Sequence, residues 1–374
     1  MENFAEMSPL VAYALDGLRR CWMPASGRYS HRYRFDRESP NESLPESDTF
    51  YTLNVLLGLS RLPEAEIRTH IDAAAVFGDC CRAATTLPLR NYAYGMALWA
   101  GAALGQALPG PLAARVRTML ADDNVLARLT AQDLGMLISG LTAQRIASAE
   151  WRPATDRLIG VLRDRYHDPG SRLFYNQATG LRRAFSSFAS QVYSLLALYQ
   201  YGEAFSQDWA IGLANEAAAG LIALQGRRGE WPWFYYVPQR RVVDFYEVYS
   251  VHQHGMAPAF LHHAVRYDVP GARDALVKGF NWLFGGNEMG ISMLRPAERM
   301  FYRSQVRHGE LDASWRRGLR SLANATLRRD DAVERHSGLV LRRECRSYEL
   351  GWILWSFGGR EDYPELTQRH EFAV

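Results

Sequence analysis

The sequence lacks the features that mark secreted and membrane-spanning proteins. Its 374 residues include only four cysteines, Cys21, Cys80, Cys81 and Cys345, and no CxxC pair. The amino-terminal stretch MENFAEMSPL carries acids where a secretory leader carries bases, so we expect a reducing, cytoplasmic location. No window approaches the run of about eighteen apolar residues that a spanning helix needs. Peripheral contact with a membrane stays open.

The chain also lacks a strong charge of one sign. Its formal net charge is +3 at pH 7, its basic residues are scattered, and Lys278 is its one lysine. This pattern gives little support to a nucleic-acid partner. The sequence has no P-loop, no GxGxxG, no GxSxG and no HExxH, which argues against nucleotide kinases, α/β hydrolases and common metalloproteases. We expect a small-molecule or oligosaccharide ligand, with no cofactor and no metal.

The chain consists largely of predicted helical segments of two types, which alternate along the sequence. Segments of the first type carry a one-sided apolar stripe, typical of surface helices; they are 7–21, 63–82, 109–121, 151–166, 207–225 and 270–284. Segments of the second type are apolar nearly all round and rich in Gly, Ala and Ser; they are 48–61, 90–105, 130–144, 186–201, 249–265 and 347–358. Two concentric rings of six satisfy this alternation, which predicts an all-α, single-domain (α/α)6 toroid over 1–374.

The connections that lead from an outer to an inner helix are generally long. The four longest are 22–47, 167–185, 226–248 and 285–346, and loops of this length usually form lids or binding sites. We expect them to gather on one face, around the amino termini of the inner helices. The longest, 285–346, is predicted to be a lid-like insertion with an extra surface helix at 312–329 and a β-ribbon.

The stretch from Gly229 to Met256 is the most unusual part of the chain. Its 28 residues hold two Trp, six Phe or Tyr, two His and three acids. We expect a loop across the mouth of a cavity, followed by a helix whose first turn, with Tyr249, His252 and Gln253, points into that cavity.

His252 is the main candidate for a general acid or base, since an imidazole near Asp244 or Glu247 can titrate near neutrality. A structural histidine is the competing interpretation. The HxH formed with His254 is a weaker hint of zinc, because two residues two apart on a helix point in different directions.

The first turns of the inner helices are predicted to form the floor of the cavity. The candidate catalytic residues are His252, Asp244, Glu247, Tyr249 and Glu349. The candidate substrate-binding residues are Trp231, Trp233, Tyr235, Tyr246, Gln253, Asp48, Tyr92, Asp133, Gln191 and Tyr348. Simple helix capping is the competing role for Asp48. Arginines on the long loops, Arg182, Arg183, Arg240 and Arg241, are further candidates for holding a carboxylate or phosphate.

Two resemblances follow. The alternation of twelve helices resembles the six-hairpin glycosidase superfamily and related toroids. Within it, YSVHQHGMAPAFLHHA (249–264) is similar to the start of an inner helix in glucuronyl C5-epimerases and unsaturated-uronide hydrolases. The resemblance implies a sugar or uronic-acid ligand, but no catalytic motif of those families is intact.

The second resemblance is to terpenoid cyclases. The run from Gln225 to Trp231 matches the Q-x(3)-G-x-W repeat of squalene-hopene cyclases, in which Gln and Trp tie an outer helix to the next loop. The DxDD motif of class II cyclases is absent.

These observations leave three hypotheses open. The leading one is an enzyme that acts on a carbohydrate or uronic-acid-containing substrate by hydrolysis, elimination or epimerisation. The alternatives are a terpenoid or polyprenyl cyclase-like enzyme and a non-catalytic toroid that binds a glycan or lipid. Carboxylates about 5 to 10 Å apart across the cavity would favour glycoside chemistry, and acids locked in salt bridges would favour the binding protein.

Overall fold

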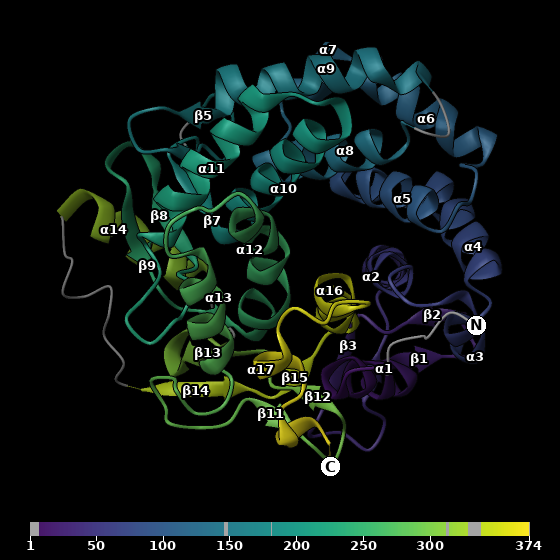
Figure 1. The fold of residues 1–374 in the computed structure, drawn as a ribbon, viewed down its shortest axis with the longest axis vertical. Helices are drawn as coiled ribbons and strands as arrows, with labels where there is room; N and C mark the ends of the chain where they lie inside the picture. The colour runs from purple at the N-terminus through teal and green to yellow at the C-terminus, as the bar shows by residue number, and fades with distance from the viewer. Residues whose placement is uncertain (1–6, 146–148, 181, 312–313, 328–337, 374) are drawn as a thin grey trace.

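Six inner helices form a closed ring at the centre of the molecule (Figure 1). The computed structural model describes residues 7–145, 149–180, 182–311, 314–327 and 338–373. The inner helices are α2 (Pro45–Leu59), α5 (Asn91–Ala103), α8 (Ala131–Ala143), α10 (Phe188–Phe205), α12 (Ala257–Arg266) and α16 (Ser347–Phe357). Each contacts the next, and α16 packs back on α2 to close the ring.

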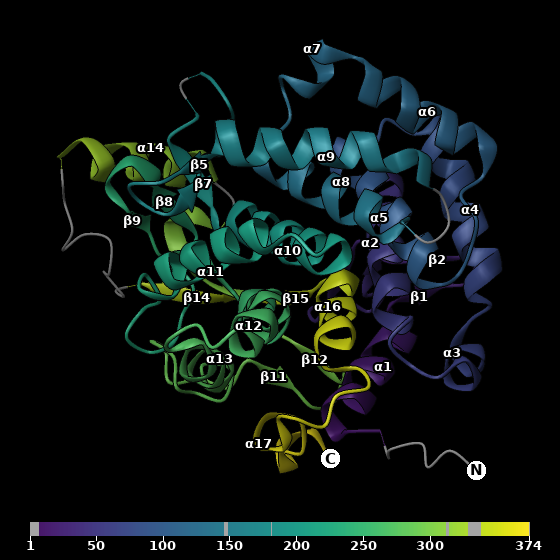
Figure 2. The same cartoon turned by 45° about the horizontal axis from the view of Figure 1, so that its top comes forward.

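An outer helix covers each inner one. The outer helices are α1 (Pro9–Cys21), α4 (Ala73–Thr86), α6 (Gly110–Ala121), α9 (Arg152–Val161), α11 (Asp208–Ile222) and α13 (Ala272–Asn281) (Figure 2). The fold is the predicted all-α (α/α)6 toroid. At its seam, the carboxyl-terminal α17 (Pro364–Thr367) packs on α1.

Two segments depart from the predicted helix boundaries. The segment 63–82 is divided into α3 (Glu64–His70) and α4, because the Asp72 carboxylate accepts a hydrogen bond from the backbone N–H of Ala75 and starts a new helix. The segment 249–265 begins as a strand and passes through a π-helical turn, His252–Met256, before α12. Pro258 explains this turn, since it has no N–H to donate to the carbonyl one α-helical turn earlier.

Glycines let the inner helices approach each other closely. A Cβ atom built on Gly58 would lie 2.3 Å from the carbonyl oxygen of Gly351 on α16. One on Gly95 would lie 2.4 Å from the carbonyl oxygen of Met136 on α8. The small residues of the inner segments therefore set the diameter of the ring.

The long loops form short antiparallel strands. Loop 22–47 holds β1 (Trp22–Met23), β2 (Arg28–Tyr29), β3 (Arg32–Arg34) and β4 (Asn41–Glu42). The next two hold β5 (His167–Asp168), β6 (Leu173–Phe174), β7 (Phe185–Ser187), β8 (Phe234–Tyr236), β9 (Arg241–Asp244) and β10 (Val248–Tyr249). Loop 285–346 holds β11 (Leu294–Arg295), β12 (Met300–Phe301), β13 (Ser304–Arg307), β14 (Leu339–Arg342) and β15 (Glu344–Cys345).

The sheets join these loops to one another. The three-stranded sheets have the orders β7-β8-β9, β10-β13-β14 and β15-β3-β4, and each of these contains strands from two different long loops. In the middle sheet Val248 pairs with Gln305, and Ser304 pairs with Arg342. The four loops therefore lie together on one face of the ring.

The longest loop also holds α14 (Ser314–Leu327), which packs against β9. This is the extra helix expected at 312–329; residues 312, 313, 328 and 329 lie outside the described residues. None of the helices in the described ranges is both long and apolar enough to cross a bilayer.

The close approach of the inner helices predicts the effect of adding one methyl group. Gly95→Ala forces a Cβ against backbone of α8 and should lower the free energy of unfolding by about 1–3 kcal/mol. Gly212→Ala is the matched control, because Gly212 lies on the outer helix α11 with nothing within 4 Å of a built Cβ; it should raise stability by up to about 1 kcal/mol. Urea unfolding measures both, and equal effects would contradict this packing.

Candidate functional site

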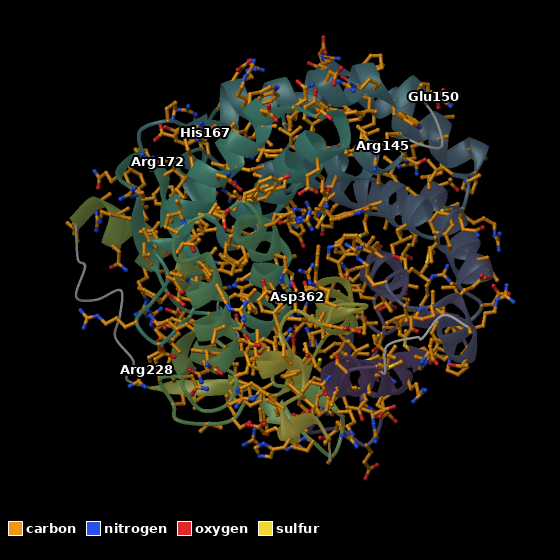
Figure 3. All side chains as sticks on the ribbon, viewed as in Figure 1. Arg145, Glu150, His167, Arg172, Arg228 and Asp362 are labelled. Atoms are coloured by element: carbon orange, nitrogen blue, oxygen red, sulfur yellow. The ribbon has the colours of Figure 1, made fainter. Side chains whose placement is uncertain are left out.

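The candidate site lies where the amino termini of the inner helices meet the strand-bearing loops. Figure 3 shows side chains extending into the centre of the ring, whereas the labelled Glu150 and Arg172 lie on its outside. A cavity of about 410 Å³ opens between the first turns of α2 and α5 and is lined in part by Phe50, Tyr51 and Tyr92. A larger one of about 560 Å³ lies at the carboxyl ends of the same helices, but the described residues lining it include no aromatic ring.

One wall of the site is a group of rings from three helices and one loop. The His31 ring stacks on Tyr51 with 5.9 Å between centroids, and Tyr51 lies 4.6 Å from Tyr348. Phe50 meets Tyr92 edge to face at 4.7 Å. Rings grouped in this way offer apolar faces with polar edges, which suits the faces of a sugar.

A second group of rings comes from the aromatic stretch singled out in the sequence. Trp233 and His252 are parallel, with 6.2 Å between their ring centroids, and Tyr249 lies 5.1 Å from each. Phe188 packs on the other side of His252 at 4.5 Å. His254 points elsewhere, to Phe301, and the described residues contain no group of three His, Cys, Asp or Glu side chains placed to hold a metal.

His252 is uncharged at neutral pH. Burial lowers its pKa to about 3, and the positive charge of Arg303 contributes. Its Nδ1 has no hydrogen-bond partner among the described residues. A neutral imidazole with an unbonded nitrogen can accept a proton there.

Glu247 is the most heavily bonded carboxylate of the site. Arg342 donates to it with Nε at 2.7 Å, and Arg317 donates with Nη1 at 3.1 Å. The hydroxyls of Tyr249, at 3.0 Å, and Ser304 also donate to it. These partners outweigh burial and lower the pKa of Glu247 to about 2. Glu247 is therefore a fixed negative charge that aligns the Tyr249 hydroxyl.

A second charged group lies at the start of α16. Arg303 Nη1 donates to Glu349 at 2.7 Å, while Arg346 reaches Glu344 with Nε at 3.3 Å and the Tyr51 hydroxyl with Nη1 at 2.9 Å. Glu349 is fully buried, and burial raises its pKa to about 8 despite the nearby arginines. This raised pKa favours the protonated form of Glu349, and a protonated Glu349 leaves two arginines facing one carboxylate, Glu344.

Asp244 belongs to a third group. Arg307 Nη1 lies 2.8 Å from Asp244 and 3.4 Å from Glu310, and Arg320 pairs with Glu310 at 2.6 Å. Asp244 has no exposed surface, and burial raises its pKa to about 6. This carboxylate anchors β9 to β13 and α14 rather than facing the cavity.

Several predicted floor residues bond backbone groups instead. Asp48 accepts hydrogen bonds from the backbone N–H groups of His31 and Leu44. Asp133 forms a capping box with Thr130 and accepts a bond from the N–H of Tyr92 at 3.0 Å. Their carboxylates tie loops to helix starts, because orphan N–H groups there need acceptors. The Gln191 side chain bonds both backbone groups of Phe174: its Oε1 accepts from the N–H of Phe174, and its Nε2 donates to the C=O of Phe174.

Other predicted ligand-binding residues are covered by protein. Trp231, Tyr235, Tyr246 and Gln253 are each at most 1% exposed. Gln225 Nε2 donates to the carbonyl oxygens of Gly229 and Ala275, both at 2.9 Å, so the Q-x(3)-G-x-W run links α11 to the next loop and to α13. Its role here is structural.

The sequence interpretation missed the arginines and His31. Arg303, Arg317, Arg342 and Arg346 all come from the predicted lid. Pairing of β13 with β10 and β14, together with packing of α14 on β9, brings Arg317 and Arg342 to Glu247. The signal available was the concentration of arginine in LRRECR (341–346). Burial and three arginines lower the pKa of His31 to about 4, which indicates a positive potential.

Comparisons with known proteins agree with this architecture. No protein-family model and no curated protein matches the sequence. Among solved structures, the cellobiose 2-epimerase of Bacillus thermoamylovorans B4167 matches with a TM-score of 0.61 at 10% identity, covering 94% of this chain and 99% of that one. An unsaturated glucuronyl hydrolase specific for heparin matches with a TM-score of 0.60 at 12% identity, covering 96% and 98%.

A third match is an inactive variant of an α-1,6-mannanase from Salegentibacter sp. HEL1_6 in complex with α-1,6-mannotriose. Its TM-score is 0.57 at 10% identity, and the match covers 93% of this chain and 97% of that one. Identities this low show the fold alone. That fold is the (α/α)6 toroid.

The raised pKa of Glu349 predicts how stability depends on pH. The native state keeps a proton that the unfolded chain loses near pH 4.5, so the free energy of unfolding should fall as pH rises from about 5 to 8, by up to about 1.4 kcal/mol per pH unit from this group. Glu349→Gln should flatten this dependence. Asp36→Asn is the control, because Arg34 lowers the pKa of Asp36 and its effect falls below pH 4. Unchanged slopes in Glu349→Gln would contradict a protonated Glu349.

Proposed function

We propose that this protein is an enzyme that acts on a carbohydrate bearing a carboxylate, such as a uronic acid, and that it removes the proton α to that carboxylate. The observation that supports this most is the combination of aromatic walls with an excess of arginine. Arg317 and Arg342 face one carboxylate, Glu247. Arg303 and Arg346 face Glu344 and a protonated Glu349. Each group is one positive charge in excess, which favours an anionic ligand.

The proposed binding mode follows from these groups. Sugar rings would lie against Trp233 and Tyr249 on one side and against Tyr51 and Tyr348 on the other. The sugar carboxylate would bind Arg346, whose side chain is 18% exposed beside the Tyr51 hydroxyl. His31 completes this end with an uncharged ring that can donate or accept a hydrogen bond.

The proposed chemistry begins with proton abstraction. His252 takes the proton from the carbon next to the carboxylate, and the electron pair of that C–H bond moves into the carboxylate to form an enolate, which the arginines stabilise. Return of a proton to the opposite face, from the Tyr51 hydroxyl on the other wall, gives epimerisation. Loss of a substituent from the next carbon, with the Tyr249 hydroxyl giving its proton to the leaving oxygen, gives elimination. A bound carboxylate beside His252 would raise its pKa and strengthen it as a base.

Hydrolysis with paired carboxylates has less support. Glu247 and Asp244 are held by arginines, and Glu349 is fully buried. The mannanase variant described as inactive has two neighbouring aspartates replaced. Among the described residues of this chain, the neighbouring aspartates are Asp122 and Asp123, which are exposed on the outside of the ring at α7 (Asp123–Leu126).

One alternative function, a non-catalytic glycan-binding protein, is supported by a specific observation. Because the acids near the site are all engaged with arginines or backbone, a toroid that binds an acidic glycan without turning it over fits the same contacts. The cyclase-like alternative fits less well, since a carbocation would be repelled by four arginines.

We further propose that 285–346 acts as a lid within the single domain. It contributes Ser304, Arg317 and Arg342, all of which bond Glu247. An open lid would remove these donors from the site, and a closed lid would exclude water.

Substitution tests the catalytic assignment. His252→Ala and Tyr249→Phe should each lower kcat on an acidic oligosaccharide by about a hundredfold or more, because each removes a proton-transfer group. His263→Gln is the matched control: His263 stacks on Tyr199 and pairs with Glu203, outside the site, and should keep full activity. Deuterium uptake from D₂O into recovered substrate reports abstraction directly. Activity within a few-fold of the parent in both variants would refute the assignment.

A ligand screen tests the substrate class. Uronic-acid oligosaccharides at a hundred times their Kd should add about 2.7 kcal/mol of apparent stability, and Arg346→Gln should weaken this effect more than it weakens binding of a neutral oligosaccharide. Stabilisation by prenyl compounds alone would support the cyclase instead. Binding of uronides without turnover or deuterium uptake would support the binding protein.

A further inference from the structure

Helix α14 is amphipathic, but its apolar side faces away from the protein. Trp315 is 64% exposed, Leu319 58% and Leu322 49%, and Leu327 near its end is 59% exposed. Trp315 and Leu319 are four residues apart, and Leu319 and Leu322 are three apart, which places all three on one helix face. Of the seven large apolar side chains exposed among the described residues, these are four. Such a concentration marks an interaction surface.

The polar side of α14 faces inward. Arg317 reaches Glu247 and lies over the Trp233 ring at 5.1 Å, and Asn324 Nδ2 donates to the carbonyl oxygen of Val243 at 2.9 Å. Ser321 is buried on the same side. The core therefore holds α14 by its polar face, and packing within the described residues gives no reason for the apolar one.

The position of the helix narrows the choice of partner. In Figures 1 and 2 α14 lies at the outer edge of the molecule, away from the ring. The exposed apolar side chains of α14 therefore lie on a helix at the edge of the molecule. A protruding apolar face suits insertion into a soft surface, whereas a docked peptide needs a concave site.

The charged residues within α14 are all arginines. The helix contains no Asp or Glu, and Arg316 lies next to Trp315, with its guanidinium 5.5 Å from the ring. Arg240, at the tip between β8 and β9, is exposed, and its neighbour Arg241 donates to the carbonyl of Asn324 at 3.4 Å. Two copies of α14 packed together would bring arginines face to face with no acid from either helix, which disfavours self-association.

We propose that the outer face of α14 binds the surface of a bilayer containing anionic lipid. Trp315 would lie at the level of the headgroups, with Leu319 and Leu322 in the acyl boundary, and Arg316 and Arg240 would contact lipid phosphates. Because Arg317 on the same helix bonds Glu247, the bilayer would hold α14 in the position that completes the site.

The test is co-sedimentation of the full chain with vesicles of phosphatidylcholine, with and without phosphatidylglycerol. The parent should bind the anionic vesicles more tightly, and added salt should weaken binding. Leu319→Ser or Trp315→Ser should lower the partition coefficient by about tenfold, the effect of withholding one large apolar side chain from the bilayer. Arg316→Gln should lower binding to the anionic vesicles alone.

The matched control is Trp209→Ser, because Trp209 is also exposed, at 37%, but lies on α11. It should bind vesicles as the parent does. Absence of binding by the parent, or equal losses in Trp209→Ser and Trp315→Ser, would overturn the proposal. So would a dimer, detected by sedimentation without vesicles, that Leu319→Ser dissociates, because the face would then belong to a second copy. Unchanged thermal unfolding of each variant separates lost binding from lost folding.

Discussion

The buried carboxylate of Glu247 is the constraint on which the functional face depends. An unpaired charge in that position would cost several kcal/mol, so its donors must come to it. They come from β13, β14 and α14, segments that no hydrophobic stripe would bring over the ring. One negative charge thus aligns the Tyr249 hydroxyl, binds two arginines and turns the polar side of α14 inward. The apolar side of that helix faces outward as a consequence.

The ring and its loops have different roles: the ring provides the packed core, and the loops carry the polar and charged groups of the candidate site. The inner helices pack backbone against backbone at glycines such as Gly58 and Gly95, which leaves no freedom in their spacing. The loops are held by short strand pairs and by ion pairs. Toroids of one geometry serve different reactions because the groups on the loops differ. In this chain those groups are arginines, tyrosines and two uncharged histidines.

Burial and the number of nearby donors together explain why the titratable groups have different charges despite sharing one site. Glu247 has four donors and stays ionised, whereas Glu349, equally buried, has one arginine close by and keeps its proton. His252 and His31 are uncharged, because burial and the positive charge of neighbouring arginines both disfavour a protonated imidazolium ring. The site therefore combines excess positive charge with neutral proton acceptors, an arrangement suited to an anionic substrate.

The sequence by itself determined the architecture, because helix amphipathicity is a local property: the twelve helices and the toroid follow from the spacing of apolar residues, and the long loops from their lengths. It also indicated the aromatic stretch with Trp233, Tyr249 and His252. For Asp48 the sequence left helix capping and ligand binding both open, and it did not indicate the structural roles of Asp133 and Gln191, since whether a polar side chain bonds backbone or faces a cavity depends on neighbours far away in the chain. Only the tertiary structure decided that Arg317, Arg342 and Glu247 meet, because β10 pairs with β13 across about fifty intervening residues and no local pattern encodes that pairing.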